Sequence, residues 1–173
     1  MKNNKSYAVI GLGRFGSAVA KELAKGGADV LAIDINEENV SNIAEYVTHA
    51  VKADVTEADV MKTLGIGNMD TVIVAVGRSM EASILATITA KELGVPYVIA
   101  KAQDEMHTKI LTKVGADRVI IPEKESGIRI ARTLINGNCL DFIELSDHVS
   151  MVEIPVRQEW IGRNLRELDL RRV

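Results

Sequence analysis

Short apolar runs alternate with longer amphipathic segments along most of this chain. Because the runs are continuous, with no polar residue at every second position, they are typical of strands buried on both faces of a parallel sheet. The segments between them carry apolar residues at helical spacing, for example Ile84, Leu85 and Ile88. This alternation predicts an α/β fold with a doubly wound parallel sheet. The predicted strands cover 7–10, 30–33, 49–52, 71–76, 97–100 and 118–121.

Glycines mark the ends of several predicted helices. A glycine just after a helix takes the left-handed backbone conformation without a steric penalty and so ends the helix. The glycines expected to do this are Gly26, Gly65, Gly94 and Gly115. With right-handed crossovers between parallel strands, the C-terminal ends of the strands then meet at one edge of the sheet.

The first apolar run leads directly into a glycine-rich turn, Gly11-Leu12-Gly13-Arg14-Phe15-Gly16. Gly11 permits the tight turn, Gly13 lets the backbone approach a pyrophosphate, and Gly16 lets the following helix pack closely on the strand. The N-terminus of that helix offers free N–H groups to an anion. Asp34, at the end of the second strand, is placed to accept hydrogen bonds from ribose hydroxyls. Together these features predict a nucleotide site on a six-stranded Rossmann-type sheet.

Arg14 lies in the first turn of the predicted helix, where the helix dipole disfavours a cation. Its guanidinium is a candidate ligand for a phosphate of its own nucleotide or of one in a facing subunit, and the alternative is a solvated arginine. Ile35 and Asn36 follow Asp34 with no arginine nearby to receive a 2′-phosphate. This favours recognition of a ribose 2′-hydroxyl and disfavours NADP. Asn36 is also a suitable N-cap for the next helix.

Further candidates follow the third and fifth strands. Asp54, next to Val55, could contact adenine or ribose, but either Asp54 or Thr56 could equally be the N-cap of the next helix. Lys101 lies just after the fifth strand and is expected at the edge of the cleft, with a surface lysine as the alternative. These positions extend the predicted site along the same edge of the sheet.

The fourth and sixth strands also end in candidate residues. Val76, Gly77 and Arg78 follow the fourth strand beside the glycine turn, where Gly77 would give backbone access and Arg78 would face phosphate or solvent. Glu123 follows the sixth strand. Its carboxylate could hold a cation near phosphates, or cap the next helix, which the sequence favours.

Composition excludes several classes of function. The formal net charge of −3 and pI near 5.7 argue against a nucleic-acid partner. A single cysteine, Cys139, forms no intrachain disulfide framework, is expected to be a packing residue, and fits a reducing cytoplasm. No apolar stretch approaches the roughly 18 residues of a membrane span. Any connection with a membrane is therefore expected to run through a partner.

Catalytic residues are hard to find in this sequence. His49, His107 and His148 are scattered, without zinc-ligand spacing, and His107 is expected to be an exposed helix residue. An NAD-dependent oxidoreductase, or its cofactor-binding fragment, is the alternative function. Hydride transfer would need an acid or base near the nicotinamide, and the sequence offers no convincing candidate. The pattern favours a sensor without enzymatic activity.

The pattern changes after Pro122. Apolar residues at Ile128, Ala131 and Ile135 predict a helix over 123–136, whose stripe covers the sheet or reaches a neighbouring subunit. A helical or irregular segment is expected next, with the apolar residues Leu140, Phe142, Ile143 and Leu145. Alternation over 150–156 predicts the first strand of another lobe. The chain that remains is too short for an independent core, so this lobe is expected to be truncated.

Several motifs, taken in order, resemble the RCK (KTN) domain of the cytoplasmic regulatory subunits of bacterial Ktr/Trk potassium uptake systems. The resemblance extends over about residues 6–150 and continues weakly to Val173. The motifs that carry it are Ala8-Val9-Ile10-Gly11-Leu12-Gly13-Arg14-Phe15-Gly16, Ala32-Ile33-Asp34-Ile35-Asn36, Lys101-Ala102-Gln103, Gly115-Ala116-Asp117-Arg118 and Ile121-Pro122-Glu123-Lys124.

The resemblance implies a regulator that is not an enzyme. Such subunits form homodimers, which assemble into an octameric ring beneath a membrane-embedded potassium translocator. ATP and ADP compete for the nucleotide site, NAD or NADH occupies it in relatives, and exchange changes the ring and so the gating of transport. A potassium channel or cation/proton antiporter that carries this module in one longer polypeptide is a further alternative.

The resemblance also implies roles for individual residues and a division into domains. Gly11, Gly13 and Gly16 would cradle phosphate, Asp34 would hold ribose, Arg14 would contact a γ-phosphate across the dimer, and Glu123 would hold a cation at the dimer interface. The implied domains are an N-terminal nucleotide-binding domain (1–122), a crossover helix with a dimerisation segment (123–149), and the start of a truncated C-terminal lobe (150–173).

Overall fold

The computed structural model describes residues 5–135, 141–146, 149–153, 156, 158–164 and 166–168. The chain divides into two compact units, Met1–Pro122 and Glu123–Val173. Cys139 and His148, for which the sequence suggested packing and no metal role, lie outside the described residues. The candidate site residues, apart from Glu123, belong to the first unit.

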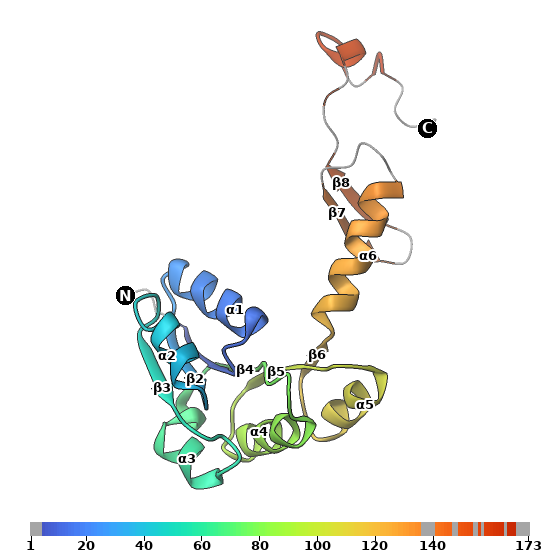
Figure 1. The fold of residues 1–173 in the computed structure, drawn as a ribbon. Helices are drawn as coiled ribbons and strands as arrows, with labels where there is room; N and C mark the ends of the chain where they lie inside the picture. The colour runs from blue at the N-terminus through green and yellow to red at the C-terminus, as the bar shows by residue number, and fades with distance from the viewer. Residues whose placement is uncertain are drawn as a thin grey trace. The chain divides into compact units, whose positions relative to one another are not determined.

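The first unit contains a six-stranded parallel sheet with the strand order β3-β2-β1-β4-β5-β6. This order confirms the predicted doubly wound Rossmann-type fold (Figure 1). The direction in which strands are added reverses between β1 and β4, which is where such sheets bind ligands. The strands are β1 (Ser6–Ile10), β2 (Asp29–Asp34), β3 (His49–Lys52), β4 (Thr71–Val74), β5 (Tyr97–Lys101) and β6 (Arg118–Ile120).

Helices cover both faces of this sheet because both faces of its central strands are apolar. In β1, Ala8 and Ile10 belong to one core cluster and Val9 to the other, and all three are fully buried. The first cluster includes residues of α3 (Ala58–Thr63), α4 (Met80–Glu92) and α5 (Glu105–Lys113). The second includes residues of α1 (Arg14–Lys25) and α2 (Glu37–Ile43). The two sets of helices thus form the outer layers around the sheet.

Left-handed glycines end most of these helices, as predicted. Gly65, Gly94 and Gly115 have φ values of 71°, 82° and 102°. The prediction for Gly26 was wrong, because Gly26 has a φ of −72° and the left-handed residue is Gly27. Gly26 still continues the hydrogen bonding of α1 by donating its N–H to the Glu22 carbonyl, so the chain reverses one residue later.

The second unit contains most of α6 (Pro122–Ile135), a hairpin of β7 (Asp141–Ser146) and β8 (Val149–Glu153), and a 3-10 turn, η2 (Gln158–Trp160). The helix confirms the element predicted over 123–136. The helical or irregular segment predicted for Phe142, Ile143 and Leu145 was wrong, because β7 pairs with β8 in antiparallel register, while Leu140 lies outside the described residues. This pairing supplies backbone hydrogen bonds that a local apolar pattern does not reveal. The strand expected from residue 150 is present as β8.

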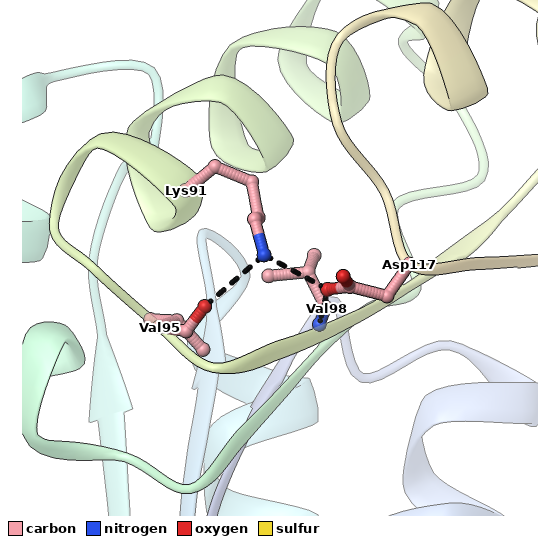
Figure 2. Close-up of polar contacts among 4 residues, drawn as sticks. All are labelled: Lys91, Val95, Val98 and Asp117. Atoms are coloured by element: carbon pink, nitrogen blue, oxygen red, sulfur yellow. Dashed lines mark hydrogen bonds and ion pairs between the residues drawn. The ribbon is translucent and has the colours of Figure 1, made fainter.

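A charged contact fixes the end of α4 to strands β5 and β6 (Figure 2). Lys91 Nζ lies 2.9 Å from Asp117 Oδ2 and also donates to the Val95 carbonyl oxygen at 3.3 Å. The same Asp117 oxygen accepts the backbone N–H of Val98 at 2.7 Å. Burial raises the pKa of Asp117, but hydrogen bonds from Val98 and Lys91 outweigh burial and hold it below its ordinary value. The motif residue Asp117 therefore has a structural role.

We expect Asp117→Ala to lower the free energy of unfolding by about 1–2 kcal/mol at neutral pH, because the Val98 amide loses its charged acceptor. The folded pKa of Asp117 lies below its unfolded value, so this stabilisation is present above the unfolded pKa and is lost as the pH falls through the folded pKa. Urea unfolding at pH 7 and at several values below pH 4 measures both effects. The difference between variant and wild type should shrink in acid.

Asp29→Ala is the matched control, because Asp29 is exposed and its side chain makes no hydrogen bond with a residue that the structure describes. Its effect should stay within about 0.5 kcal/mol at every pH. Equal losses in the two aspartate variants would show that the contact in Figure 2 adds nothing to stability.

Candidate functional site

The glycine turn begins where β1 ends, beside the loop that follows β4. Gly11 has a φ of 91°, and its N–H donates to the Ile33 carbonyl oxygen at 2.8 Å. A Cβ at Gly11 would lie 2.9 Å from both Ala75 C and Val76 N, so no side chain fits there. The predicted strand 71–76 ends earlier, at Val74, because Ala75 and Val76 turn past Gly11. The turn therefore needs glycine both for its conformation and for the close approach of two loops.

Gly16 lies inside α1 and is buried. A Cβ at Gly16 would overlap the Gly11 carbonyl oxygen and would lie 3.2 Å from Ala75 Cβ. The start of α1 is held against the glycine turn by a hydrogen bond from the Ser17 hydroxyl to the Leu12 carbonyl oxygen, at 2.7 Å. This close packing is the role that the sequence predicted for Gly16.

Gly13 and Gly77 differ from these two glycines because each faces open space. A Cβ built on either residue would meet no protein atom within 4 Å, and both residues are exposed. Gly13 is the N-cap of α1 with no side-chain cap, and the first turn of α1 contains no acidic residue. The N–H groups of a first helical turn have no partner within the helix. An anion therefore has both room and hydrogen-bond donors at this helix end.

Asp34 connects the end of β2 to the glycine turn. Its Oδ2 accepts the Leu12 N–H at 2.6 Å and the Asn39 side-chain amide at 3.2 Å, and its Oδ1 accepts the Asn36 N–H at 2.8 Å. A carboxylate has about four acceptor positions, so these three donors leave room for about one more. Asp34 thus positions the loop, and the ribose contact that the sequence suggested stays a prediction.

The neighbours of Asp34 take different roles. Asn36 is the N-cap of α2, where its side-chain oxygen accepts the Glu38 N–H at 2.8 Å, and this confirms the capping prediction. Ile35 is 63% exposed and so presents an apolar surface beside Asp34. Leu12 is buried, whereas Phe15 is half-buried and packs against the core cluster that includes Val9.

Two arginines directly follow the open glycines Gly13 and Gly77 in the sequence. Arg14 is the first residue of α1 and is exposed, and Arg78 is exposed on the loop between β4 and α4. Within the described parts of the chain, neither side chain makes an ion pair or a hydrogen bond. Cations near a helix N-terminus oppose the helix dipole. Both guanidinium groups are therefore available to an anion that binds there.

Asp54 does not cap α3. The N-cap of that helix is Glu57, whose side chain makes no capping bond, so the proposal that Asp54 or Thr56 fills this position was wrong. Asp54 instead accepts the Thr56 N–H at 3.0 Å and the Thr56 hydroxyl at 2.7 Å. These bonds, the backbone one first, lower the pKa of Asp54. They close a turn before the helix begins, while Val55 is buried in the core.

Lys101 and Glu123 lie at the ends of other elements. Lys101 is the last residue of β5 and is half-buried. Glu123 is in the first turn of α6 and not at its N-cap, because the helix already begins at Pro122, a residue suited to a first helical position. The cap predicted for Glu123 was therefore wrong. Among the residues that the structure describes, no three His, Cys, Asp or Glu side chains are grouped to hold a metal ion.

Sequence reasoning misplaced His107 and missed Gln103. His107 is fully buried and not exposed, because α5 turns His107 and Leu111 to the core and leaves Met106 63% exposed. Burial lowers the pKa of His107, and the Asp104 carboxylate partly offsets this. Gln103 donates its side-chain amide to the Gly77 carbonyl oxygen at 2.6 Å. The i, i+4 spacing of His107 and Leu111 was the available signal for burial, whereas nothing local signalled the contact of Gln103.

The residues around the glycine turn fit a nucleotide. The open faces of Gly13 and Gly77 and the start of α1 suit phosphate groups, with Arg14 and Arg78 nearby in sequence. The remaining acceptor position of Asp34 suits a ribose hydroxyl.

In the described ranges, no helix is both long and apolar enough to cross a membrane.

Comparisons with known proteins show the family of this chain. Residues 7–122 match the family model of the TrkA-N domain. The chain is 48% identical over 168 residues to the Ktr system potassium uptake protein A of Bacillus subtilis (strain 168), which covers 97% of this chain and 76% of the relative. The sequence-based family resemblance is thereby confirmed.

Solved structures with the same fold include two of the GsuK channel. The channel bound to NAD superposes with a TM-score of 0.67 at 16% identity, over 98% of this chain and 31% of the channel chain. The structure of GsuK bound to ADP gives a TM-score of 0.61 at 16% identity, over 99% of this chain and 52% of that chain. At this identity the likeness concerns the fold.

Proposed function

The chain belongs to the TrkA-N domain family, and from that premise we propose that it is a nucleotide-binding regulatory subunit of a membrane potassium transporter. The observation that carries the proposal is the open phosphate cradle at Gly13 and Gly77, beside the close-packed Gly11 and Gly16. The 48% identity to a potassium uptake protein supports the transport role. The name of that relative describes the uptake of an ion and no chemical reaction, and this supports regulation without catalysis.

The ligands proposed are ATP and ADP, with NAD or NADH as further occupants. Structures of GsuK with NAD and with ADP support a fold that accepts both kinds of nucleotide. The backbone from Gly11 to Gly16 would hold the phosphates, and Asp34 the ribose. The apolar surface of Ile35 and the turn at Asp54 and Val55 would lie on the nucleoside side. Val76, Gly77, Arg78 and Lys101 would complete the site.

The assembly proposed is a homodimer that forms an octameric ring on the cytoplasmic side of a membrane, bound to a potassium-translocating subunit. Arg14 would contact the γ-phosphate of a nucleotide in the facing subunit, and Glu123 would hold a cation at the dimer interface. The exposed position of Arg14 at a helix end that disfavours cations supports a role toward an anion. ATP brings a terminal phosphate that ADP lacks, and Arg14 would respond to that difference.

Regulation by ligand exchange requires that two ligands differ in their affinity for two arrangements of the ring. A ligand that binds both arrangements equally shifts nothing, however tightly it binds. A contact made by Arg14 with ATP only would supply the required difference. Gating therefore depends on the side chain that separates ATP from ADP and not on the shared phosphate cradle.

Equilibrium binding of ATP, ADP, NAD, NADH and NADPH to the purified chain tests the ligand part of the proposal. A ligand at one hundred times its Kd should stabilise the fold by about 2.7 kcal/mol. We expect distinct stabilisation by ATP and ADP and weak binding of NADPH. Binding confined to NAD and NADH would favour the oxidoreductase instead, and no binding at all would refute the nucleotide site.

We expect Arg14→Ala to weaken ATP binding about tenfold or more and to leave ADP binding within about twofold, because a charge-assisted hydrogen bond to phosphate contributes about 1.5–3 kcal/mol. Isothermal titration with both nucleotides measures the split. Lys25→Ala is the control, since Lys25 is an exposed cation in the last turn of the same helix. Equal losses for ATP and ADP would refute a contact with the γ-phosphate.

Potassium flux tests the regulatory part. Liposomes that contain the translocating subunit should show a flux that changes when this chain is added, and ATP and ADP should change it differently. In Arg14→Ala, the two nucleotides should give the same flux. A potassium flux that is the same with and without this chain would contradict the regulatory role, even if the chain binds nucleotides.

A further inference from the structure

We propose that Gln103 is a positioning residue of the nucleotide site, which holds the loop after β4 in a binding-competent conformation through the carbonyl group of Gly77. The inference rests on the proposed function, because it concerns the same site. It assigns a role to a side chain that does not belong to the glycine turn and that comes from a different loop, the one between β5 and α5.

The contact that carries the inference is a short hydrogen bond between two loops. Gln103 Nε2 donates to the Gly77 carbonyl oxygen at 2.6 Å, across 26 residues of sequence. A carbonyl oxygen only accepts hydrogen bonds, so the amide nitrogen and not the amide oxygen of Gln103 must face it. Strands β4 and β5 pair in parallel, with Val74 opposite Ala100. The loops that follow these two strands therefore leave the sheet at the same edge.

The backbone around Gln103 is anchored to the core. Its own N–H donates to Nδ1 of the fully buried His107 at 3.3 Å, and the preceding Ala102 N–H donates to the Ile120 carbonyl oxygen at 2.8 Å. The following Asp104 caps α5 by accepting the His107 N–H at 2.8 Å. A side chain attached to so fixed a backbone can act as a rigid support for a neighbouring loop.

The burial of His107 is consistent with this anchoring role. Because Nδ1 accepts a hydrogen bond, the neutral imidazole carries its proton on Nε2, and this buried atom has no partner among the described residues. A buried donor without a partner is unfavourable. The ring nevertheless remains inside, where its other nitrogen fixes Gln103. An exposed glutamine at the end of that chain of contacts is then available for Gly77.

Gly77 is a residue that needs such support. It is exposed, it has no side chain to pack, and a Cβ there would touch nothing within 4 Å. Glycine loses more conformational freedom than any other residue when it becomes ordered. The loop is fixed on both sides of Gly77, since Val76 N lies close to Gly11 and the Ser79 hydroxyl caps α4 by accepting the Ala82 N–H at 3.1 Å. The bond from Gln103 would restrain the middle of the loop before the ligand arrives, which lowers the cost of binding.

Gln103→Met tests the proposal, because methionine has a similar length and no amide donor. We expect the variant to bind ATP and ADP about threefold to tenfold more weakly, the factor that corresponds to one hydrogen bond. The affinities for ATP and for ADP should fall by the same factor, in contrast to Arg14→Ala. Hydrogen exchange of the ligand-free protein should become faster at amides 76–78 and stay unchanged in the sheet.

Lys113→Met is the control, because Lys113 is an exposed residue in the last turn of α5, the helix that follows Gln103, and lies far along the chain from Gly77. Urea unfolding should give the same stability for the wild type and both variants. Unchanged affinity in Gln103→Met, or unchanged exchange at 76–78, would overturn the inference while the proposed function stands. A wild type that binds no nucleotide would overturn both.

Discussion

Gly13→Ala should weaken the binding of ATP and ADP about tenfold to a hundredfold and leave the free energy of unfolding within about 0.5 kcal/mol of wild type. The expected loss corresponds to about one charge-assisted hydrogen bond to phosphate, which a methyl group at this position would displace. The new Cβ would meet no protein atom within 4 Å, so it would collide only with a ligand. Isothermal titration and urea unfolding of the same sample measure both quantities.

The backbone of Gly13 does not require glycine. Its φ of −66° and ψ of −172° suit alanine, so no strain accompanies the change. Gly127→Ala is a control for alanine in place of glycine, because a Cβ there also meets nothing within 4 Å and Gly127 is not a candidate site residue. Nucleotide affinity that survives in Gly13→Ala would show that no phosphate lies against this residue, and the proposed site would have to move.

Gly16→Ala should, unlike Gly13→Ala, lower the stability of the fold, with a loss of about 3 kcal/mol in the free energy of unfolding. The added Cβ would overlap the Gly11 carbonyl oxygen and crowd Ala75, and these atoms are backbone or short side chain that cannot swing away. Overpacking of this kind typically costs about 1–3 kcal/mol, and a clash with backbone lies at the upper end. Urea unfolding gives the free energy, and a fall in thermal midpoint of several degrees should accompany it.

Ala20→Gly in the same helix separates packing from helix propensity. Ala20 is buried, and its replacement should cost about 1 kcal/mol through propensity together with a small loss of packing. Gly16→Ala gains in propensity by a similar amount, so a net loss there can come only from the clash. A Gly16→Ala protein as stable as wild type would show that α1 moves away from the turn at no cost.

The two variants, Gly13→Ala and Gly16→Ala, distinguish glycines that the fold requires from glycines that ligand binding would require. Gly11 and Gly16 are constrained by contacts with the chain itself, whereas Gly13 and Gly77 face space that no described residue fills. The sequence motif already predicted different roles for Gly11, Gly13 and Gly16. The loop at Ala75 and Val76, far away in sequence, supplies the contacts that require glycine at Gly11 and Gly16.

Much of the fold followed from local pattern because the parallel sheet buries both faces of its strands. Continuous apolar runs then mark the central strands, and the strand predicted over 7–10 lies within β1 (Ser6–Ile10), whose last three residues are fully buried. His107 was misplaced for a related reason. Packing against α4 and β6 decides which side of α5 faces the core, and it turns the polar His107 inward and leaves the apolar Met106 exposed.

The hairpin of β7 and β8 shows a different limit. A strand in an antiparallel hairpin depends on its partner for hydrogen bonds, so the segment around Phe142 and Ile143 carried no helical or extended signal strong enough to decide. The N-caps show a similar limit of prediction from local sequence. Asn36 was predicted correctly because its helix starts with a clear acidic turn, whereas Asp54 bonds to Thr56 before α3 begins.

The sequence by itself determined the strand and helix order of the first unit, the position of the glycine turn and the identity of the acidic residue beside it. These features depend on neighbours within a few residues, through apolar periodicity, glycine conformation and helix capping. The tertiary structure alone decided that Asp34 clamps Leu12, that Gln103 reaches Gly77, and which glycines face open space. Those contacts join segments that are brought together only when parallel strands align their C-terminal ends at one edge of the sheet.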